Sequence, residues 1–370
     1  MSEIYIGLMS GTSMDGIDAA LVDFTDDCVT MLASHSRKYT PELQQQLDNA
    51  LQLQDPRAAD LTETDKLVGE EFAAAAIELL EKTEVTADQV VAIGSHGQTI
   101  RHAPDAAEPY SLQLGSAAAI CATTGIDTVA DFRRADIAAG GQGAPLAPAF
   151  HAAVFTNDSE HRVVVNIGGI SNITVLPAGG NGPVTGFDAG PGNTLMDIWI
   201  RRHHGRSFDE DGAWAAGGRP DARLLAAMLR DAYFHTPPPK STGREYFNRA
   251  WLSSYLQGLS TKARDVQATL GKLTAVVITD AIEQYAPATQ RVLVCGGGVH
   301  NAFLMRCLSE NLPDLPVEST RALGVDPDWV EATAFAWLAK QHLQGKPGNI
   351  PEVTGACEAV VLGKLFRHSQ

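Results

Sequence analysis

Short apolar runs that end in glycine-rich polar turns recur along the chain and predict an α/β fold. In residues 4–24 two such runs flank a turn of Gly, Ser, Thr and Asp, which is typical of a β-hairpin. Residues 162–176 repeat the pattern of strand, small polar turn and strand about midway along the chain. We infer that each half of the chain begins with the same supersecondary unit.

The segments after the first hairpin alternate between helical and strand patterns. A leucine repeat predicts an amphipathic helix over 41–51, behind a Thr40 cap, and a second helix begins near Thr62. Residues 90–94 form a continuous apolar run, the mark of a buried strand, and we expect it to end in a polar loop at 95–99. Strand, helix and strand in this order imply a parallel crossover, with ligands at the carboxyl edge.

The second half adds a further strand and a third glycine turn. A strand over 184–187 runs into Asp188, and residues 205–290 are largely helical. A buried strand at 292–295 then leads into Gly296, Gly297 and Gly298. We read the glycine-rich stretch 139–145 as a flexible boundary. The expected domains are 1–138, rejoined by the C-terminal segment 352–370, and 139–351 with a helical insertion over 205–290.

Composition narrows the class of protein. At 370 residues with 44% hydrophobic residues the chain is long enough for two cores, and its net charge of −16 argues against binding nucleic acid or an anionic membrane. The five cysteines are scattered without C-x-x-C spacing, which favours a reduced, cytoplasmic compartment. No run of 18 apolar residues and no basic leader are present, so we expect neither a membrane span nor a signal peptide.

Glycine-rich turns after buried strands can hold an anion, because backbone N–H groups crowd around phosphate oxygens there. In the first turn Asp15 or Asp18 is placed to hold Mg²⁺. A single turn of this kind is as often an ordinary hairpin, but three of them point to a cleft with a phosphate-binding hairpin from each half. The chain has no G-x-x-x-x-G-K-[ST] segment, which excludes a P-loop. No strand leads into G-x-G-x-x-G, which argues against a Rossmann dinucleotide-binding site.

Several long motifs together resemble the anhydro-N-acetylmuramic acid kinases, and the match covers essentially the whole chain. They lie at residues 8–18, 95–99, 131–133, 140–145, 166–172, 186–193, 295–301 and 331–336. The resemblance implies two duplicated actin-like (ribonuclease H-like) α/β domains that close over ATP. It also implies a bacterial enzyme of cell-wall recycling, which converts 1,6-anhydro-N-acetylmuramic acid, ATP and water to N-acetylmuramic acid 6-phosphate and ADP.

The same resemblance assigns the nucleotide contacts. Residues 11–18 would form the first phosphate motif, 166–172 the second, and 296–298 would flank the adenosine. One departure from the wider superfamily concerns the metal: its first hairpin carries Asp-x-Gly-Thr, and this chain has Met9 at the Asp position. Asp15 and Asp18 are therefore the metal candidates. The full expected ATP set is Gly11, Thr12, Ser13, Met14, Asp15, Gly16, Ile17, Asp18, Asn166, Gly168, Gly169, Asn172, Gly296, Gly297 and Gly298.

Asp188 is the predicted catalytic base. A 1,6-anhydro sugar has no free 6-hydroxyl, so phosphorylation must be coupled to ring opening. Glycoside hydrolysis needs a carboxylate that activates water, and Asp188 follows a strand, has glycines nearby and matches the family's catalytic aspartate. Without the resemblance, an Asp that caps the following helix or bonds its own loop would be the stronger interpretation.

Four further residues are candidates for binding the sugar. Arg133 can pair with the lactyl carboxylate of a muramic acid, although a surface arginine that neutralises Asp131 or Asp136 explains it nearly as well. Glu331 lies in the first turn of a helix, where the dipole alone favours a carboxylate, and only the resemblance makes it a substrate contact. His96 and Gln98, in the strand-end loop, are assigned to binding only.

Two other functions remain open from the sequence. One is a kinase of the same fold that acts on an ordinary sugar hydroxyl. The other is an ATP-driven chaperone or regulator. We do not favour it, because this sequence shows no appended peptide-binding or DNA-binding module. The expected partner is a small amino sugar, and the sequence leaves the oligomeric state open, with a homodimer as one candidate.

Overall fold

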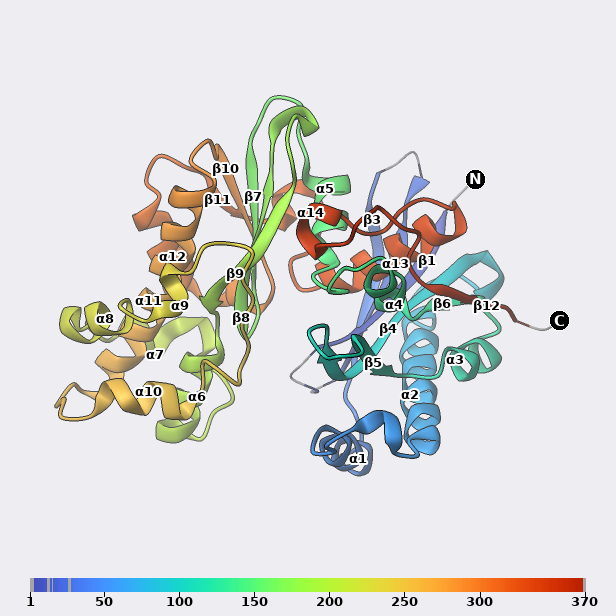
Figure 1. The fold of residues 1–370 in the computed structure, drawn as a ribbon, viewed down its shortest axis with the longest axis horizontal. Coiled ribbons are helices and arrows are strands. Elements are labelled where there is room, and N and C mark those ends of the chain that lie inside the picture. The colour runs from blue at the N-terminus through green and yellow to red at the C-terminus, as the bar shows by residue number, and fades with distance from the viewer. Residues whose placement is uncertain (1–2, 12–13, 15, 26–27, 369–370) are drawn as a thin grey trace. The chain divides into compact units, whose positions relative to one another are not determined.

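The opening hairpin is formed as predicted and lies at the centre of a mixed sheet (Figure 1). The computed structural model describes residues 3–11, 14, 16–25 and 28–368. The chain divides into two compact units, and the described residues form two hydrophobic core clusters in the first unit and one in the second. The first unit runs to Val154 and includes the chain from Trp329 onward, and the second spans Phe155–Asp328.

The sheet of the first unit has the order β12-β6-β4-β1-β2-β3, with β5 paired to the far end of β4. The strands β1, β2 and β3 form an antiparallel meander, and β4 and β6 run parallel to β1. The bounds are β1 Ile4–Ser10, β2 Ile17–Asp23, β3 Thr30–Arg37, β4 Val90–Ala103, β5 Tyr110–Leu114, β6 Thr128–Ala130 and β12 Lys364–Phe366.

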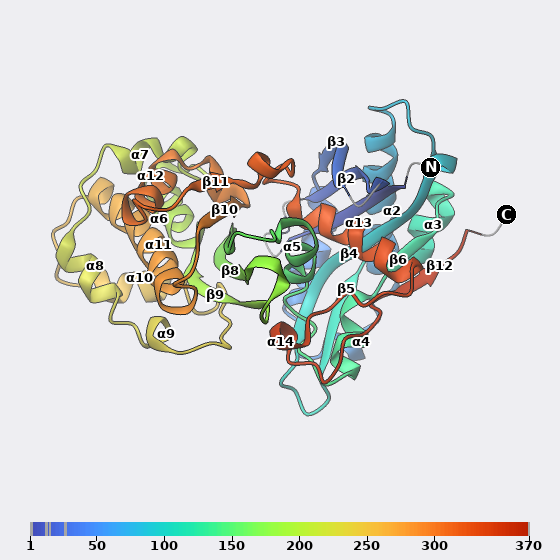
Figure 2. The ribbon, with the colours of Figure 1, turned by 90° about the horizontal axis from the view of Figure 1, so that it is seen from above.

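Alternation along β1 directs side chains to two cores. Ile4, Ile6 and Leu8 face α1, α2 and α3, whereas Tyr5 belongs to the core formed with α13. Figure 2 shows α13 crossing the strands of this sheet. The helices of this unit are α1 Pro41–Leu51, α2 Thr62–Leu80, α3 Ala117–Thr124, α4 Phe132–Ala138, α5 Ala147–Phe155, whose last residue lies in the second unit, α13 Val330–Leu343 and α14 Pro351–Thr354.

The sheet of the second unit has the order β9-β8-β7-β10-β11. Its bounds are β7 Arg162–Ile167, β8 Ile170–Leu176, β9 Thr185–Pro191, β10 Arg291–Cys295 and β11 Val317–Ser319. The long helix α11, Ala263–Tyr285, packs in the core beneath this sheet together with α6, Thr194–His204, and α12, Ala302–Asn311. The shorter helices are α7 Ala213–Ala216, α8 Ala222–Met228, α9 Ala232–His235 and α10 Arg249–Leu256, which bear out the helical region predicted for 205–290.

The two sheets repeat one topology. In each, an antiparallel meander of three strands is followed by two strands parallel to the first, so that β1, β2, β3, β4 and β6 correspond to β7, β8, β9, β10 and β11. This is the duplicated, actin-like (ribonuclease H-like) arrangement, and it confirms the expected fold class. Met9 pairs with Asp18 in the first sheet, as Asn166 pairs with Asn172 in the second.

Three details differ from the sequence-based predictions. The segment 95–99 is not a loop: β4 continues to Ala103, because after its pairing with β1 ends at Gln98 the strand pairs with β5. Asp188 lies inside β9 rather than after it, opposite Asn172. The stretch 139–145 is pinned rather than flexible, since the buried Asp136 carboxylate accepts the Gly143 N–H at 2.7 Å and Thr354 O accepts the Gln142 N–H at 2.8 Å.

The unit bounds also lie elsewhere than 138 and 352. Helix α13 packs directly on β1 and β4, which places the chain from Trp329 in the first unit. Phe150 of α5 contacts Trp337 of α13 at a ring distance of 6.2 Å, so α5 is held to the same unit. Among the described residues, no helix is long and apolar enough to cross a membrane.

Candidate active site

The turn of the first hairpin is braced by a buried glutamine from β4. The Gln98 side-chain N–H donates to Gly11 O at 3.2 Å, and the Ser10 hydroxyl lies 2.7 Å from both Gln98 Oε1 and Gly16 O. Gln98 is fully buried, so its contacts fix Ser10 and Gly11 at the end of β1. The predicted ATP residues Thr12, Ser13 and Asp15 lie outside the described residues.

Asp18 lies at the foot of this turn. It is directly opposite Met9 in the antiparallel register, and opposite residues project to the same face of a sheet. Its carboxylate is also close enough to Glu331, in the first turn of α13, to affect that residue. Loss of hydration and the charge of Asp18 raise the pKa of Glu331, and the guanidinium of Arg133 opposes the shift. Asp18, Glu331 and Arg133 therefore form one electrostatic cluster.

Arg133 is fixed in this cluster by a neutral histidine. His96 lies in β4, is 5% exposed and stacks against Phe335 of α13 with ring centroids 4.7 Å apart. Burial, and then the charge of Arg133, hold the pKa of His96 well below its usual value. Its Nδ1 is 2.8 Å from Gly97 O, which assigns the proton to Nδ1 and leaves Nε2 as an acceptor.

The Nε2 atom of His96 accepts from Arg133 Nε at 3.2 Å and Nη2 at 2.8 Å, while Arg133 Nη1 donates to Gly143 O at 2.7 Å. Arg133 lies in the first turn of α4. Burial lowers the pKa of Arg133 to about 10, which keeps it charged at neutral pH. Of the two carboxylates in the alternative interpretation, Asp131 pairs with Arg134 at 2.8 Å, whereas the charge of Asp136 does act on Arg133 and raises its pKa against burial.

The second unit places its predicted residues on and beside one face of its sheet. Asn166, Asn172 and Asp188 lie opposite one another across β7, β8 and β9. The Gly296 turn packs against the end of β7, because a Cβ at Gly296 would lie 2.3 Å from Asn166 Oδ1, and one at Gly298 would lie 2.3 Å from Ile167 Cγ2. The unit thus gathers the Gly168–Gly169 turn, Gly296–Gly298 and Asp188 into one constellation.

Asp188 is held by a loop that the sequence did not single out. Its Oδ2 accepts the Thr242 N–H at 2.9 Å, its own N–H donates to Lys240 O at 3.2 Å, and its carbonyl accepts the Tyr233 hydroxyl at 2.8 Å. Burial raises the pKa of Asp188 to about 6, against the opposing hydrogen bond from Thr242. A carboxylate with this pKa is ionised at neutral pH and still basic enough to accept a proton.

From its sequence, the proline-rich stretch 236–243 is predicted to be a rigid loop between helical segments. No spacing rule links it to Asp188 across fifty residues, because the link is made by backbone hydrogen bonds. Sequence reasoning therefore missed the link between this loop and Asp188.

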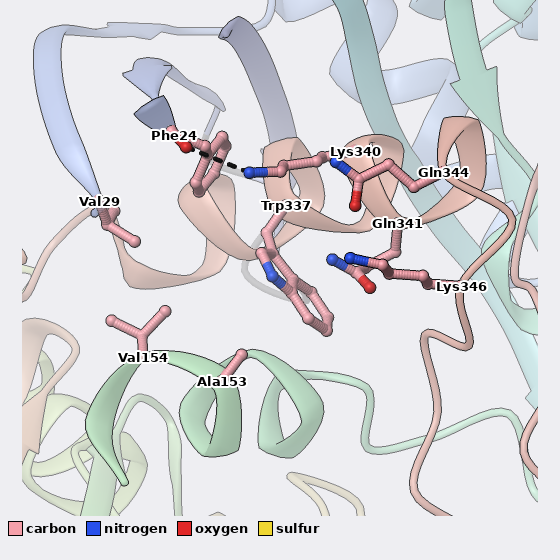
Figure 3. A pocket seen from close by; sticks show the side chains of 9 residues that line it. All are labelled: Phe24, Val29, Ala153, Val154, Trp337, Lys340, Gln341, Gln344 and Lys346. Carbon is pink, nitrogen blue, oxygen red and sulfur yellow. Dashed lines mark hydrogen bonds between the residues drawn. The ribbon is translucent and has the colours of Figure 1, made fainter. Parts of the chain in front are cut away.

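A cavity of about 340 Å³ lies elsewhere in the first unit, beside α13 (Figure 3). Its buried cation, Lys340, already donates to Phe24 O at 3.1 Å and pairs with Glu3 at 2.7 Å. The cavity contains none of the predicted site residues. It is lined by Phe24, Val29, Ala153, Val154, Trp337, Lys340, Gln341, Gln344 and Lys346.

Comparison with known proteins gives the family. Residues 3–368 match the family model described as anhydro-N-acetylmuramic acid kinase. A relative of that name from Xanthomonas axonopodis pv. citri is 50% identical over 369 residues, which cover 99% of this chain and 98% of the relative. Relatives of the same name from Xylella fastidiosa and Coxiella burnetii are 49% and 47% identical, cover 98% of this chain each, and are themselves covered to 96% and 97%. The chain is therefore a kinase and belongs to the anhydro-N-acetylmuramic acid kinase family.

Proposed function

We propose that this kinase uses ATP and water to open the 1,6-anhydro ring of 1,6-anhydro-N-acetylmuramic acid and to phosphorylate O6. The name shared by relatives over nearly the whole chain supports the substrate. In this sugar O6 is bonded to C1, so no free 6-hydroxyl is available for direct phosphorylation. The reaction must break the C1–O6 bond in the step that forms the O6–phosphorus bond.

The single observation that carries the mechanism is Asp188, held by Thr242 with its pKa raised to about 6. We assign it as the base that takes a proton from water as the water oxygen bonds to C1. The electron pair of the C1–O6 bond goes to O6, which attacks the γ-phosphorus, and the bond to the ADP oxygen breaks. One base suffices because the phosphorus captures the developing alkoxide, which in ordinary glycoside hydrolysis needs an acid.

ATP is proposed to bind through the glycine turns of the two hairpins. The residues assigned in the first are Gly11, Thr12, Ser13, Met14, Asp15, Gly16, Ile17 and Asp18, and in the second unit Asn166, Gly168, Gly169, Asn172 and Gly296–Gly298. Mg²⁺ bound to ATP would neutralise phosphate charge. Among the described residues no group of three or more His, Cys, Asp or Glu could hold a metal ion. Asp18 fits as the protein ligand of Mg²⁺, since it lies opposite Met9.

Arg133 is proposed to bind the lactyl carboxylate of the sugar, and Glu331 a hydroxyl or amide of it. His96 orients Arg133, and Gln98 shapes the nucleotide turn. Such a substrate derives from peptidoglycan, so we place the enzyme in the recycling of cell-wall sugars in the cytoplasm, where ATP is available.

The test of the proposed function is ADP release that depends on the anhydro sugar, with the product analysed after reaction in ¹⁸O-labelled water. We expect N-acetylmuramic acid 6-phosphate with one ¹⁸O at C1. Turnover of glucose or N-acetylglucosamine without label at C1 would favour an ordinary sugar kinase instead. ATP hydrolysis stimulated by peptide and indifferent to sugar would favour a chaperone or regulator. Either result would overturn the proposal.

Replacing His96 by Ala is expected to raise the KM for the sugar about tenfold, because a hydrogen bond to a charged group is worth about 1.5 kcal/mol and Arg133 loses two of its three. The KM for ATP should stay within about twofold. His102→Ala is the matched control, since His102 lies further along β4, is exposed and contacts Ser111. Equal effects on both substrates would contradict the assignment of Arg133 to the sugar.

A further inference from the structure

The loop that holds Asp188 is anchored at both of its ends. At its start, Lys240 and Thr242 are hydrogen-bonded to Asp188. At its end, Phe247 is fully buried and stacks on Phe234, with ring centroids 5.6 Å apart. We call residues 240–247 the base loop. Both ends of the base loop are therefore fixed, and Arg244, Glu245 and Tyr246 between them are exposed.

Arg244, in the middle of the base loop, lies over the glycine turn of the second hairpin. A Cβ at Gly169 would lie 3.0 Å from Arg244 Nε and 3.1 Å from Nη2, so the guanidinium lies directly against this glycine. Arg244 is exposed and forms no salt bridge with any carboxylate in the described part of the chain. Its positive charge therefore acts at this turn without an ion-pair partner, although it does lower the pKa of Asp197 in α6 against the larger effect of burial.

A buried hydroxyl lies beside the guanidinium. Thr194, the first residue of α6, is 6% exposed, and its Oγ1 has no hydrogen-bond partner among the described residues. The same position of a Cβ at Gly169 would be 2.8 Å from this oxygen. A buried polar atom without a partner is costly in a folded protein, and a bound ligand is one of the few things that remove this cost.

The backbone carbonyls of the Gly168–Gly169 turn accept hydrogen bonds from residues 192–194. Gly168 O accepts the Asn193 N–H at 2.8 Å, and Gly169 O accepts the N–H groups of Gly192 at 2.9 Å and Thr194 at 3.1 Å. The acceptor groups of the turn are thus satisfied by the start of α6. An unpaired cation and a free hydroxyl donor beside a glycine turn suit an oxyanion, because charge-assisted hydrogen bonds from arginine match phosphate geometry.

We propose that Arg244 binds the phosphoryl group that the enzyme transfers, with the Thr194 hydroxyl as a second donor. This inference rests on the proposed function, in which the second hairpin holds the phosphates of ATP and Asp188 is the base. Arg244 stabilises the charge on the phosphoryl oxygens as the bond to ADP breaks. One loop thereby carries both the hydrogen bond that positions the base and the cation for the phosphate.

The test compares Arg244→Ala and Arg244→Lys with Arg249→Ala, an exposed arginine in the first turn of α10. We expect kcat to fall about 10²-fold in Arg244→Ala, which is the usual effect of removing one preorganised donor, and less in Arg244→Lys. Added guanidinium chloride at millimolar concentration should restore part of the activity of Arg244→Ala, and potassium chloride should not. Arg249→Ala should behave as wild type.

A second variant separates binding from folding. Thr194→Val removes a hydroxyl that no described residue uses and keeps the shape of the side chain. We expect an unchanged melting temperature and a kcat lowered about fivefold.

The affinity of Arg244→Ala for a non-hydrolysable ATP analogue should fall, and its affinity for ADP should stay within about twofold of wild type, because ADP lacks the transferred group.

The outcomes distinguish this inference from the proposed function. If the wild-type protein releases ADP with the anhydro sugar and Arg244→Ala turns over within twofold of it, Arg244 does not bind the phosphoryl group and the function stands. A lower melting temperature with equal losses for ATP analogue and ADP would show that Arg244 only supports the loop. If wild-type protein gives no sugar-dependent ADP, the proposed function itself fails.

Discussion

Asp188→Asn is expected to lower kcat by about 10³-fold or more, while ATP still binds. The amide oxygen of Asn can accept the Thr242 N–H as the carboxylate does, so the geometry is kept and only the base is lost. General bases contribute about 10²–10⁴-fold, and Asp188 is the carboxylate that accepts from Thr242 in the described part of the chain. The measurement is steady-state ADP release together with nucleotide binding by calorimetry. Undiminished turnover would remove Asp188 as the base.

The same substitution should stabilise the protein at alkaline pH. The pKa of Asp188 is raised from 3.8 in the unfolded chain to about 6 in the folded protein, which means that folding favours the protonated carboxyl. The stability of the folded protein is therefore highest below the unfolded pKa, and part of it is lost as the pH rises through 6 and Asp188 ionises. Ionised Asp188 then lowers the free energy of unfolding by about 1–2 kcal/mol, after a discount for its partial exposure. We expect Asp188→Asn to melt above wild type at pH 8 and to lose this advantage at pH 4.

The pH profile of the wild-type enzyme gives an independent reading of the same group. Because the base must be ionised, kcat/KM should fall below about pH 6 with a slope of one. Glu245→Gln is the matched control, since the charge of Glu245 raises the pKa of Asp188. This variant should stay active and move the acid limb to lower pH by a few tenths of a unit. An acid limb that Glu245→Gln leaves in place would mean that another group titrates.

The hairpins, the main helices and the duplication were all readable from sequence. Local signals fix these elements: the Thr40 side chain caps α1, Ser116 caps α3, and Gly125 ends it with a φ of 70°. Their residues carry the preference themselves, so no distant contact is needed. The recurrence of strand, turn and strand likewise predicted that β1 and β2 would correspond to β7 and β8.

The missed features depend on contacts between distant segments. The length of β4 is set by pairing with β5, which replaces β1 as its neighbour at Gln98. Asp188 is extended inside β9 because β8 pairs with it, and its partner Thr242 comes from a loop fifty residues away. Arg133 was expected at the site, but its partner His96 was recognised only once both segments were placed. The periodicity of apolar residues predicts which face of an element is buried, but it does not predict which other element packs against that face.

Helix α13 shows this most clearly, because its distance from the sheet depends on two glycines. A Cβ at Gly7 of β1 would lie 1.7 Å from Ala332 O, and a Cβ at Gly94 of β4 would lie 2.0 Å from Phe335 O. Both obstacles are backbone atoms of α13, so a rotamer change cannot relieve them. The helix backbone packs directly against the backbone of the strands. This contact fixes the distance between the first hairpin and Glu331, which is next to Ala332.

Gly7→Ala is therefore expected to lower the free energy of unfolding by about 4 kcal/mol or more, at the upper end for single substitutions, since α13 must lift off β1. Thermal melting would measure the loss, and Gly297→Ala is the control, because the nearest heavy atom to its added Cβ is 4.0 Å away. Any folded Gly7→Ala protein should also bind the sugar poorly, because Glu331 moves with the helix. A variant that melts like wild type would show that α13 does not depend on this close approach to hold Glu331 beside Asp18 and Arg133.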